Sequence, residues 1–194
     1  MNFCPKCGSI VEQAIPEGDN RLRDICTSPS CGKIHYQNPR VITGCIVESE
    51  EKILFCRRAI QPRYGLWTLP AGFMENSETI SEGAARETME EANADVEVID
   101  LFSVFTLAHI NQVYMLFRAK LKTPHFGPGM ESLEVELLDE SQVPWDQLAF
   151  AAITETMRLY FADRKAGGFR THIGEMRPVE GDKYLGYQVD MLER

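Results

Sequence analysis

Three glutamates at helical spacing carry the clearest chemistry in this sequence. Glu87 and Glu91 are four residues apart and Glu90 is three from Glu87, so on a helix their carboxylates share one side. Like charges at this spacing destabilise a helix unless something neutralises them. A hard divalent cation such as Mg²⁺, bound by carboxylate oxygens and itself binding phosphate, would do so. For three glutamates alone, a solvated acidic face is the simpler interpretation.

Paired cysteines near the start of the chain predict a second metal site. Two close pairs are separated by eighteen residues, and each pair can direct two sulfurs at one centre, as tetrahedral zinc requires: Cys4, Cys7, Cys26 and Cys31. Gly8 and Gly32 follow the second cysteine of each pair, where a tight turn favours glycine. His35 is an alternative ligand, but four sulfurs already suffice. Reduced cysteines without metal, or disulfides in an exported protein, are the alternatives.

The sequence predicts a core role for the other two cysteines and a reducing compartment for the protein. Cys45 and Cys56 lie in apolar runs and are predicted to be inert core residues. No run approaches ~18 apolar residues, and the first residues do not form a signal peptide. We therefore expect a cytoplasmic protein, without membrane contact, in which paired cysteines bind metal.

Composition and charge limit the partners and the domain organisation that fit the sequence. The 194 residues carry a formal charge of −9, with 29 acidic against 20 basic side chains. Nine of the acids and one of the bases lie between residues 75 and 100. Because nucleic-acid binding depends on excess Lys and Arg, a nucleic-acid partner is not expected. The change of composition along the chain predicts a zinc ribbon over residues 1–38, a larger domain over 39–165, and an extension over 166–194 with little hydrophobic pattern.

Hydrophobic periodicity predicts an α/β domain after the cysteine module. A helix is expected over 79–92, with Thr79 and Glu82 as a capping box and Asn93 as a left-handed C-cap. Its inward face should include Met89, and Gly83 should leave room for a ligand beside Glu87. A second helix is expected over 148–165. Strands are predicted over 41–47, 53–58, 96–105, 112–121 and 135–138, with one apolar face on 112–121 and a loop over 61–72.

The segment from Gly72 to Ala94 resembles the signature of the Nudix family. The pattern Gly-x5-Glu-x7-Arg-Glu-aliphatic-x-Glu-Glu is matched in register by Gly72, Glu78, Arg86, Glu87, Glu90 and Glu91. The sequence departs from the pattern where Asn93 replaces a glycine, Thr88 replaces an aliphatic residue and Ala94 is smaller than usual. These departures concern packing rather than metal chemistry.

The resemblance implies a fold and roles for individual residues. The Nudix fold is an α/β/α sandwich around a mixed sheet, and its members hydrolyse a diphosphate linked to another group with the help of Mg²⁺ or Mn²⁺. The implied ligands are Glu87, Glu90, Glu91 and the backbone carbonyl of Ala71. Glu78 and Arg86 correspond to a structural pair. Acidic residues near the strand over 135–138 are candidates for the general base, and Glu131 and Glu134 fit better than Glu136.

A zinc ribbon before a Nudix domain narrows the expected substrate. The chain resembles the FAD and ADP-ribose pyrophosphatases of plant chloroplast type and their bacterial relatives, through segments such as Gly65–Gly72 and Phe126–Glu134. The expected reaction converts FAD to FMN and AMP, or ADP-ribose to ribose 5-phosphate and AMP. Residues that could contact the phosphates or the rings are Arg57, Arg58, Arg63, Tyr64, Trp67 and Phe105, although a core position is favoured for Trp67.

Two alternatives and the assembly state stay open at this point. An NADH or NAD-capped RNA pyrophosphatase is one alternative, but the Ser-Gln-Pro-Trp-Pro-Phe-Pro-type motif of NADH pyrophosphatases does not occur in this sequence. The other is a non-catalytic module in which the ribbon binds nucleic acid or another ligand. Residues 1–40 hold five Lys or Arg against four acids, a weak basis for binding phosphates. By analogy with relatives, a homodimer is expected.

Overall fold

The computed structural model describes residues 1–179 and 186–192 and divides the chain into two compact units. The first unit is Met1–Pro39 and the second is Arg40–Arg194. Part of the extension expected over 166–194 therefore lies outside the described residues. Among the described residues, no helix is long and apolar enough to cross a membrane.

The first unit is a small three-stranded antiparallel sheet in the order β1-β2-β3. Its strands are β1 (Val11–Ala14), β2 (Arg23–Cys26) and β3 (Ile34–His35). Gly8 and Gly32 both have positive φ, at 76° and 54°, so each cysteine pair ends in a turn that favours glycine, as expected. The buried apolar cluster of this unit consists of Val11 and cysteine side chains. Such a small core does not sustain a fold by hydrophobic burial alone.

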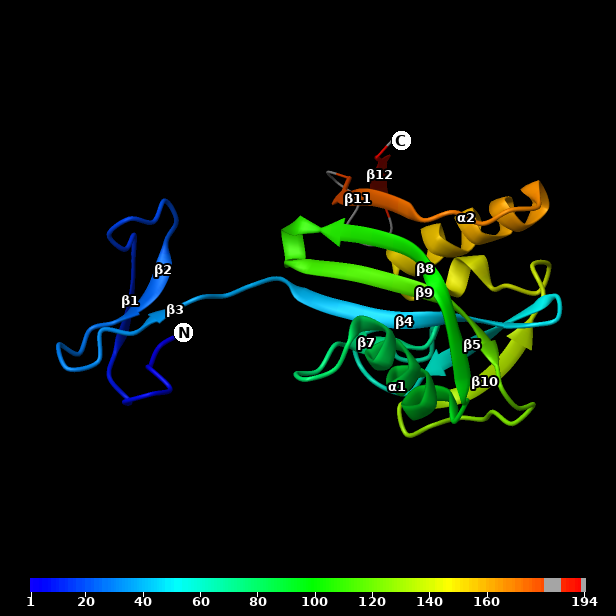
Figure 1. Ribbon diagram of the computed structural model, residues 1–194, viewed down its shortest axis with the longest axis horizontal. Helices are drawn as coiled ribbons and strands as arrows, with labels where there is room; N and C mark the ends of the chain where they lie inside the picture. Colours follow the sequence, from blue (N-terminus) through cyan, green and yellow to red (C-terminus); the bar gives the residue numbers. More distant parts are fainter. Residues whose placement is uncertain (180–185, 193–194) are drawn as a thin grey trace. The chain divides into compact units, whose positions relative to one another are not determined.

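The second unit is built on a mixed nine-stranded sheet (Figure 1). The main strand order is β10-β5-β4-β9-β8-β11-β12, with β6 beside β5 and β7 beside β4. The pairs β4–β9 and β8–β11 are parallel. The strands are β4 (Arg40–Ser49), β5 (Lys52–Arg58), β6 (Trp67–Thr68), β7 (Ala71–Phe73), β8 (Val96–Leu107), β9 (Gln112–Leu121), β10 (Ser132–Leu138), β11 (His172–Pro178) and β12 (Tyr187–Met191).

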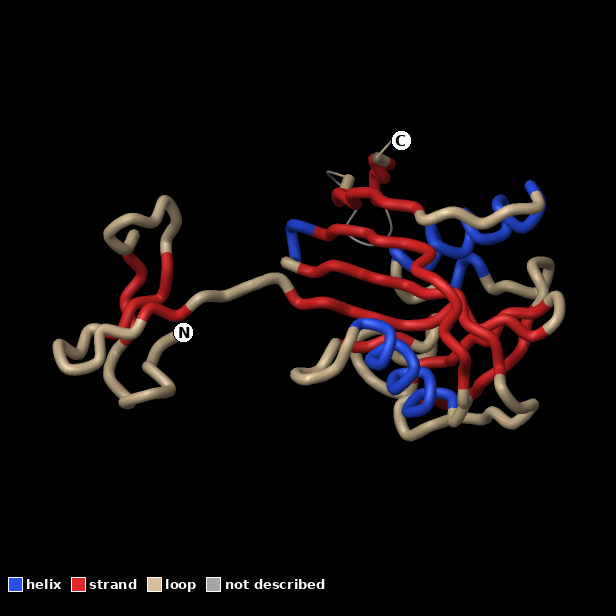
Figure 2. The backbone as a smooth tube through the Cα atoms, in the orientation of Figure 1, coloured by secondary structure: helices blue, strands red, loops and turns tan. Residues whose placement is uncertain are grey.

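Two α-helices cover opposite faces of this sheet (Figure 2). They are α1 (Ile80–Ala92) and α2 (Ala151–Ala166), and short 3₁₀ turns are η1 (Ala108–Ile110) and η2 (Trp145–Gln147). Successive residues of a strand point to opposite faces. Accordingly, Cys45 and Val47 of β4 pack with Ala84 of α1, whereas Ile46 packs with Ile153 of α2. This is the α/β/α sandwich expected from the resemblance.

The capping predictions for α1 are confirmed. The Thr79 side chain accepts from the Glu82 amide, and the Glu82 carboxylate accepts from the Thr79 amide, 2.7 Å away. Asn93 ends the helix with φ of 47°, the left-handed conformation predicted for it. One expectation for the inward face is wrong, because Met89 is exposed and Glu91 is buried instead.

The main differences from the predicted elements concern short or doubly covered strands. The predicted loop over 61–72 contains β6 and reaches the start of β7, which are too short to give a periodic signal. The segment β9 is buried on both faces, since Tyr114 and Leu116 are covered as well as Ala119, so one apolar face was too simple a prediction. The patternless extension contributes β11, paired with β8, and β12 at the sheet edge.

Candidate active site

A loop docked on the end of α1 positions one of the predicted acids. The amides of Gly127 and Gly129 donate to the carbonyls of Ala92 and Glu91, at 2.8 and 3.0 Å. Asn93 adds a side-chain hydrogen bond to the Pro128 carbonyl at 2.9 Å. A Cβ atom at position 129 would overlap the Glu90 carbonyl oxygen, so only glycine allows this approach. The loop then leads directly to Glu131.

Arg86 connects the loop before α1 with two of the predicted metal ligands. Its guanidinium donates two hydrogen bonds to Glu78, at 2.8 and 2.9 Å, which is the structural pair expected from the resemblance. It also donates to Glu87 at 2.8 Å and to Glu90 at 3.0 Å. Glu78 makes the expectation for Gly83 wrong, because a Cβ there would meet the Glu78 carboxylate at 2.6 Å. The space beside Gly83 is therefore filled by protein.

Glu87 and Glu91 are held at the cavity wall in an environment that disfavours their negative charge. Burial raises the pKa of Glu91 to about 8, although the Ala71 amide, 3.1 Å away, and the Arg58 charge act in the opposite direction. Burial also raises the pKa of Glu87, against the effect of Arg86. The charge of Glu131 raises both pKa values further. Carboxylate oxygens are ligands that suit Mg²⁺ or Mn²⁺, so these glutamates on one cavity wall could supply ligands to such an ion.

Residues of the signature segment that begins at Gly72, together with the loop residue Glu131, line one cavity of about 1430 Å³ in the second unit. The volume exceeds the ~300–1,000 Å³ of typical small-molecule sites. Gly72 lets the backbone approach the acidic wall, because a Cβ there would overlap the Glu87 carboxylate. The predicted site residues on the cavity wall are Arg58, Arg63, Ala71, Glu87, Glu90, Glu91 and Glu131.

The two favoured candidates for the general base occupy different surroundings. Glu131 lies on the cavity wall, and its charge acts on the carboxylates of Glu87 and Glu91. Glu134 is not among the cavity-lining residues and forms an ion pair with Arg57 at 3.2 Å. Arg57 also donates to the Gly65 carbonyl at 2.9 Å. The structure therefore brings Glu131, but not Glu134 or Arg57, to the carboxylates.

Of the three aromatic residues predicted as possible ring contacts, none is among the residues that line this cavity. Phe105 is completely buried in a core cluster, where a substrate ring has no access. Trp67 is 9% exposed and packs in the main core, the position that was favoured for it. Tyr64 is 56% exposed and lies outside the wall.

Other residues on the cavity wall were not selected from the sequence. Tyr114 and Phe150 line the cavity, and the Arg58 guanidinium lies 5.1 Å from the centre of the Phe150 ring. Tyr114 sits in β9 on the face opposite the predicted one, and Phe150 immediately precedes α2. Tyr187 comes from the patternless extension. Of these residues, only Tyr114 lies in a segment whose alternation could have identified it, but the predicted apolar face of that strand is the opposite one.

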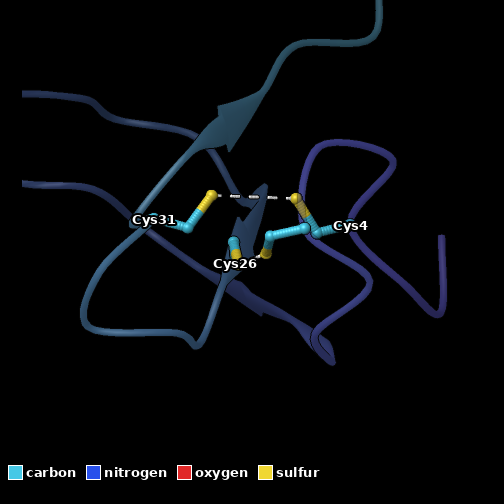
Figure 3. Close-up of side chains that lie close together, drawn as sticks. Cys4, Cys26 and Cys31 are labelled. Atoms are coloured by element: carbon cyan, nitrogen blue, oxygen red, sulfur yellow. Dashed lines mark hydrogen bonds between the residues drawn. The ribbon is translucent and has the colours of Figure 1, made fainter.

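The four paired cysteines of the first unit form a group suited to zinc (Figure 3). Their sulfurs all lie within 4.8 Å of one another, with Cys7 and Cys26 3.4 Å apart and Cys4 and Cys31 4.0 Å apart. Tetrahedral zinc with Zn–S bonds of ~2.3 Å separates its sulfurs by ~3.8 Å, so the group fits the ion. His35 is not a member of this group. Cys45 and Cys56 are buried in the second unit, as predicted.

Comparison with known families agrees with this organisation. Residues 2–37 match the family model described as Nudix N-terminal, a zinc ribbon, and residues 38–162 match the NUDIX domain. Because the second match covers well over half of the chain, the protein belongs to the Nudix family.

Individual relatives extend the comparison. A Nudix hydrolase of Nitrosomonas europaea is 55% identical in its crystal structure, with a TM-score of 0.86 over 90% of this chain and 98% of that one. NAD-capped RNA hydrolase NudC of Vibrio atlanticus is 31% identical over 74% of this chain and 51% of its own length. An ADP-ribose pyrophosphatase of Methanocaldococcus jannaschii is 30% identical over 59% of this chain and 69% of its own. The chain thus spans about half the length of that NudC relative.

Proposed function

We propose that the protein is a metal-dependent pyrophosphohydrolase that cleaves the diphosphate bond of an adenosine dinucleotide or ADP-sugar. One observation carries the proposal: Glu87, Glu91 and Glu131 lie on the wall of a large cavity that also holds Arg58. A bound cation would favour the ionised form of buried Glu91, whose pKa is raised to about 8, and would let a diphosphate approach the carboxylates.

The residues of the chain divide the work in this proposal. Glu87, Glu90, Glu91 and the Ala71 carbonyl would hold the cation. When bound, Mg²⁺ or Mn²⁺ would supply neutralisation of phosphate oxygens and a lower pKa of the attacking water. Glu131 would accept a proton from this water as its oxygen bonds to phosphorus and the bridging P–O bond breaks, and Arg58 would bind the departing phosphate. Arg86 keeps Glu87 in place through its fixed contact with Glu78.

ADP-ribose is our first choice of substrate, with FAD as the second. The cavity volume admits a whole dinucleotide, and one relative bears the name ADP-ribose pyrophosphatase. FAD rests on the sequence resemblance alone. Hydrolysis of ADP-ribose consumes one water and releases AMP and ribose 5-phosphate, whereas FAD would give AMP and FMN.

Hydrolysis of NAD-capped RNA, in place of a free dinucleotide or ADP-sugar, is the second candidate function. The name of the Vibrio relative favours it, as does the presence of a zinc ribbon before the catalytic domain. The chain lacks the NADH-pyrophosphatase motif, however, and the ribbon region is nearly neutral. We therefore place this substrate behind the free dinucleotides.

A substrate panel tests the proposal. Release of AMP or NMN from ADP-ribose, FAD, NADH and NAD-capped RNA is measured with Mg²⁺ or Mn²⁺, for wild type, Glu87→Gln and the control Glu97→Gln. Glu97 is an exposed acid on β8 and is not a cavity-lining residue. We expect turnover for wild type and Glu97→Gln and a loss of more than ~10²-fold for Glu87→Gln. No release from any substrate contradicts the proposal, and NAD-capped RNA as the best substrate favours the second candidate.

A further inference from the structure

The strand β12 contributes a residue to the cavity wall. The NUDIX match ends at residue 162, but β11 continues the sheet by pairing with β8, and β12 pairs with β11. The pair Pro178–Tyr187 places Tyr187 at the start of β12, and its side chain lines the cavity. A segment beyond the family domain therefore contributes to the substrate site of this chain.

Tyr187 is held by packing rather than exposed as a free side chain. Its ring lies 5.7 Å from the ring of His109, and it packs on the core cluster that contains Leu107 and Tyr114. The neighbouring cavity wall is formed by Leu107, Ile110, Gln112 and Tyr114. This part of the wall thus combines apolar and aromatic side chains with the Arg40 cation, whose strand position pairs with Gln112, in contrast to the carboxylates of α1.

The strand pairings place the lining residues in order across the sheet. Ile42 of β4 pairs with Phe73 of β7 on one side and with Tyr114 of β9 on the other, and β8, β11 and β12 follow beyond β9. The wall therefore passes from β7, which contacts the Glu87 and Glu91 side chains, to Tyr114 and then to Tyr187, which packs on the same cluster as Tyr114. A nucleotide has the same order of chemistry, with a diphosphate at one end and a planar base at the other.

We propose that Tyr187 is a specificity-determining residue whose ring stacks on the nucleobase of the substrate. This inference rests on the proposed function for the identity of the site. Stacking of a base on an aromatic side chain contributes enough that replacing the ring weakens binding ~5- to 150-fold. The hydroxyl is not required, because the π-face of the ring makes the contact.

Binding measurements separate this inference from hydrolysis. The affinities of AMP and ribose 5-phosphate are measured by calorimetry for wild type, Tyr187→Leu and Tyr187→Phe. Leucine keeps apolar packing against the cluster but removes the ring, whereas phenylalanine keeps the ring. Tyr36→Ala is the control, since Tyr36 is an exposed tyrosine of the first unit and is not among the cavity-lining residues.

We expect Tyr187→Leu to weaken AMP binding at least ~5-fold and to leave ribose 5-phosphate binding unchanged, while Tyr187→Phe and Tyr36→Ala bind both as wild type does. Equal affinity of the wild type for AMP and ribose 5-phosphate would overturn the inference. Unchanged AMP binding by Tyr187→Leu would also overturn it. So would an equal loss of AMP affinity in Tyr187→Leu and Tyr187→Phe. If AMP binding behaves as expected but the substrate panel shows no turnover, the proposed function alone fails.

Discussion

Glu131 and Glu134 are a matched pair of glutamates that separates catalysis from surface charge at the scale of single residues. We expect Glu131→Gln to lower kcat for the best substrate by ~10²- to 10⁴-fold, the range for loss of a general base. Glu134→Gln should stay within about two-fold of wild type, because it removes only an exposed pair with Arg57. Steady-state kinetics of the two variants gives the comparison. The opposite result would transfer the role of base to Glu134.

Glu91 shows the cost of building a cation site from buried carboxylates. The folded protein raises its pKa from an ordinary value near 4.5 to about 8, chiefly through burial. An acid whose pKa is raised by folding destabilises the fold once it must ionise. The cost is absent below about pH 4.5, grows as the pH rises, and is complete above about pH 8. A cation at the site would offset it.

Glu91→Gln should therefore stabilise the protein when no Mg²⁺ or Mn²⁺ is added. The gain in the free energy of unfolding should be near zero at pH 4.5 and exceed ~1 kcal/mol at pH 8. The amide oxygen of glutamine can still accept from the Ala71 amide. Urea unfolding at several pH values measures the difference, with Glu97→Gln as the control. A gain that does not depend on pH would show that charge burial is not its cause.

At the scale of elements, the loop over 126–131 positions Glu131 by docking on the end of α1. Gly129→Ala should push this loop away, because the new Cβ would overlap the Glu90 carbonyl. We expect a loss of about 1–3 kcal/mol in stability together with a lower kcat. Gly127→Ala is the control, since a Cβ there has nothing within 4 Å. Thermal unfolding and kinetics are measured for both variants, and equal effects would contradict the docking role.

The elements that the sequence predicted well are those with strong local signals. The capping box at Thr79 and the left-handed Asn93 depend on neighbouring residues, and both occur as predicted. The register of the glutamates on α1 follows from spacing alone. Met89 was misplaced because its spacing fits the inward face, while the structure turns that position toward the cavity.

The remaining parts of the site depend on contacts between distant segments. The approach of Gly129 to Glu90 is set by how the loop docks, and the sequence around it shows only turn-forming residues. Likewise, β12 is recognised by its pairing with β11 and not by periodicity. Tyr187 reaches the cavity only through that pairing. Tertiary placement of this kind is not encoded in local patterns.

For the whole molecule, the two units differ in what holds them together. Among the described residues, the second unit has three apolar clusters around its sheet. The apolar cluster of the first unit is limited to Val11 and cysteines. Large apolar side chains of the first unit are mostly exposed, at 58–63%: Met1, Phe3, Ile10, Ile15, Leu22 and Tyr36. We therefore expect metal binding to supply most of the folding free energy of this unit, as in small zinc domains. The expected homodimer stays a prediction, which light scattering tests.

Zinc removal should unfold residues 1–39 and leave the second unit intact. Both tryptophans, Trp67 and Trp145, lie in the second unit, so their fluorescence reports its unfolding alone. We expect one zinc per chain. Chelation of the zinc should expose four reactive thiols. The melting temperature detected by Trp fluorescence should shift by less than about 3 °C, equivalent to ~1 kcal/mol. Cys26→Ser should lose zinc, whereas Cys45→Ser, at a buried core position, should retain it. Protein purified without zinc, with four titratable thiols in its native state, would contradict the zinc site. A Trp transition lowered as much as the ribbon signal would instead show that the second unit depends on the first for its stability.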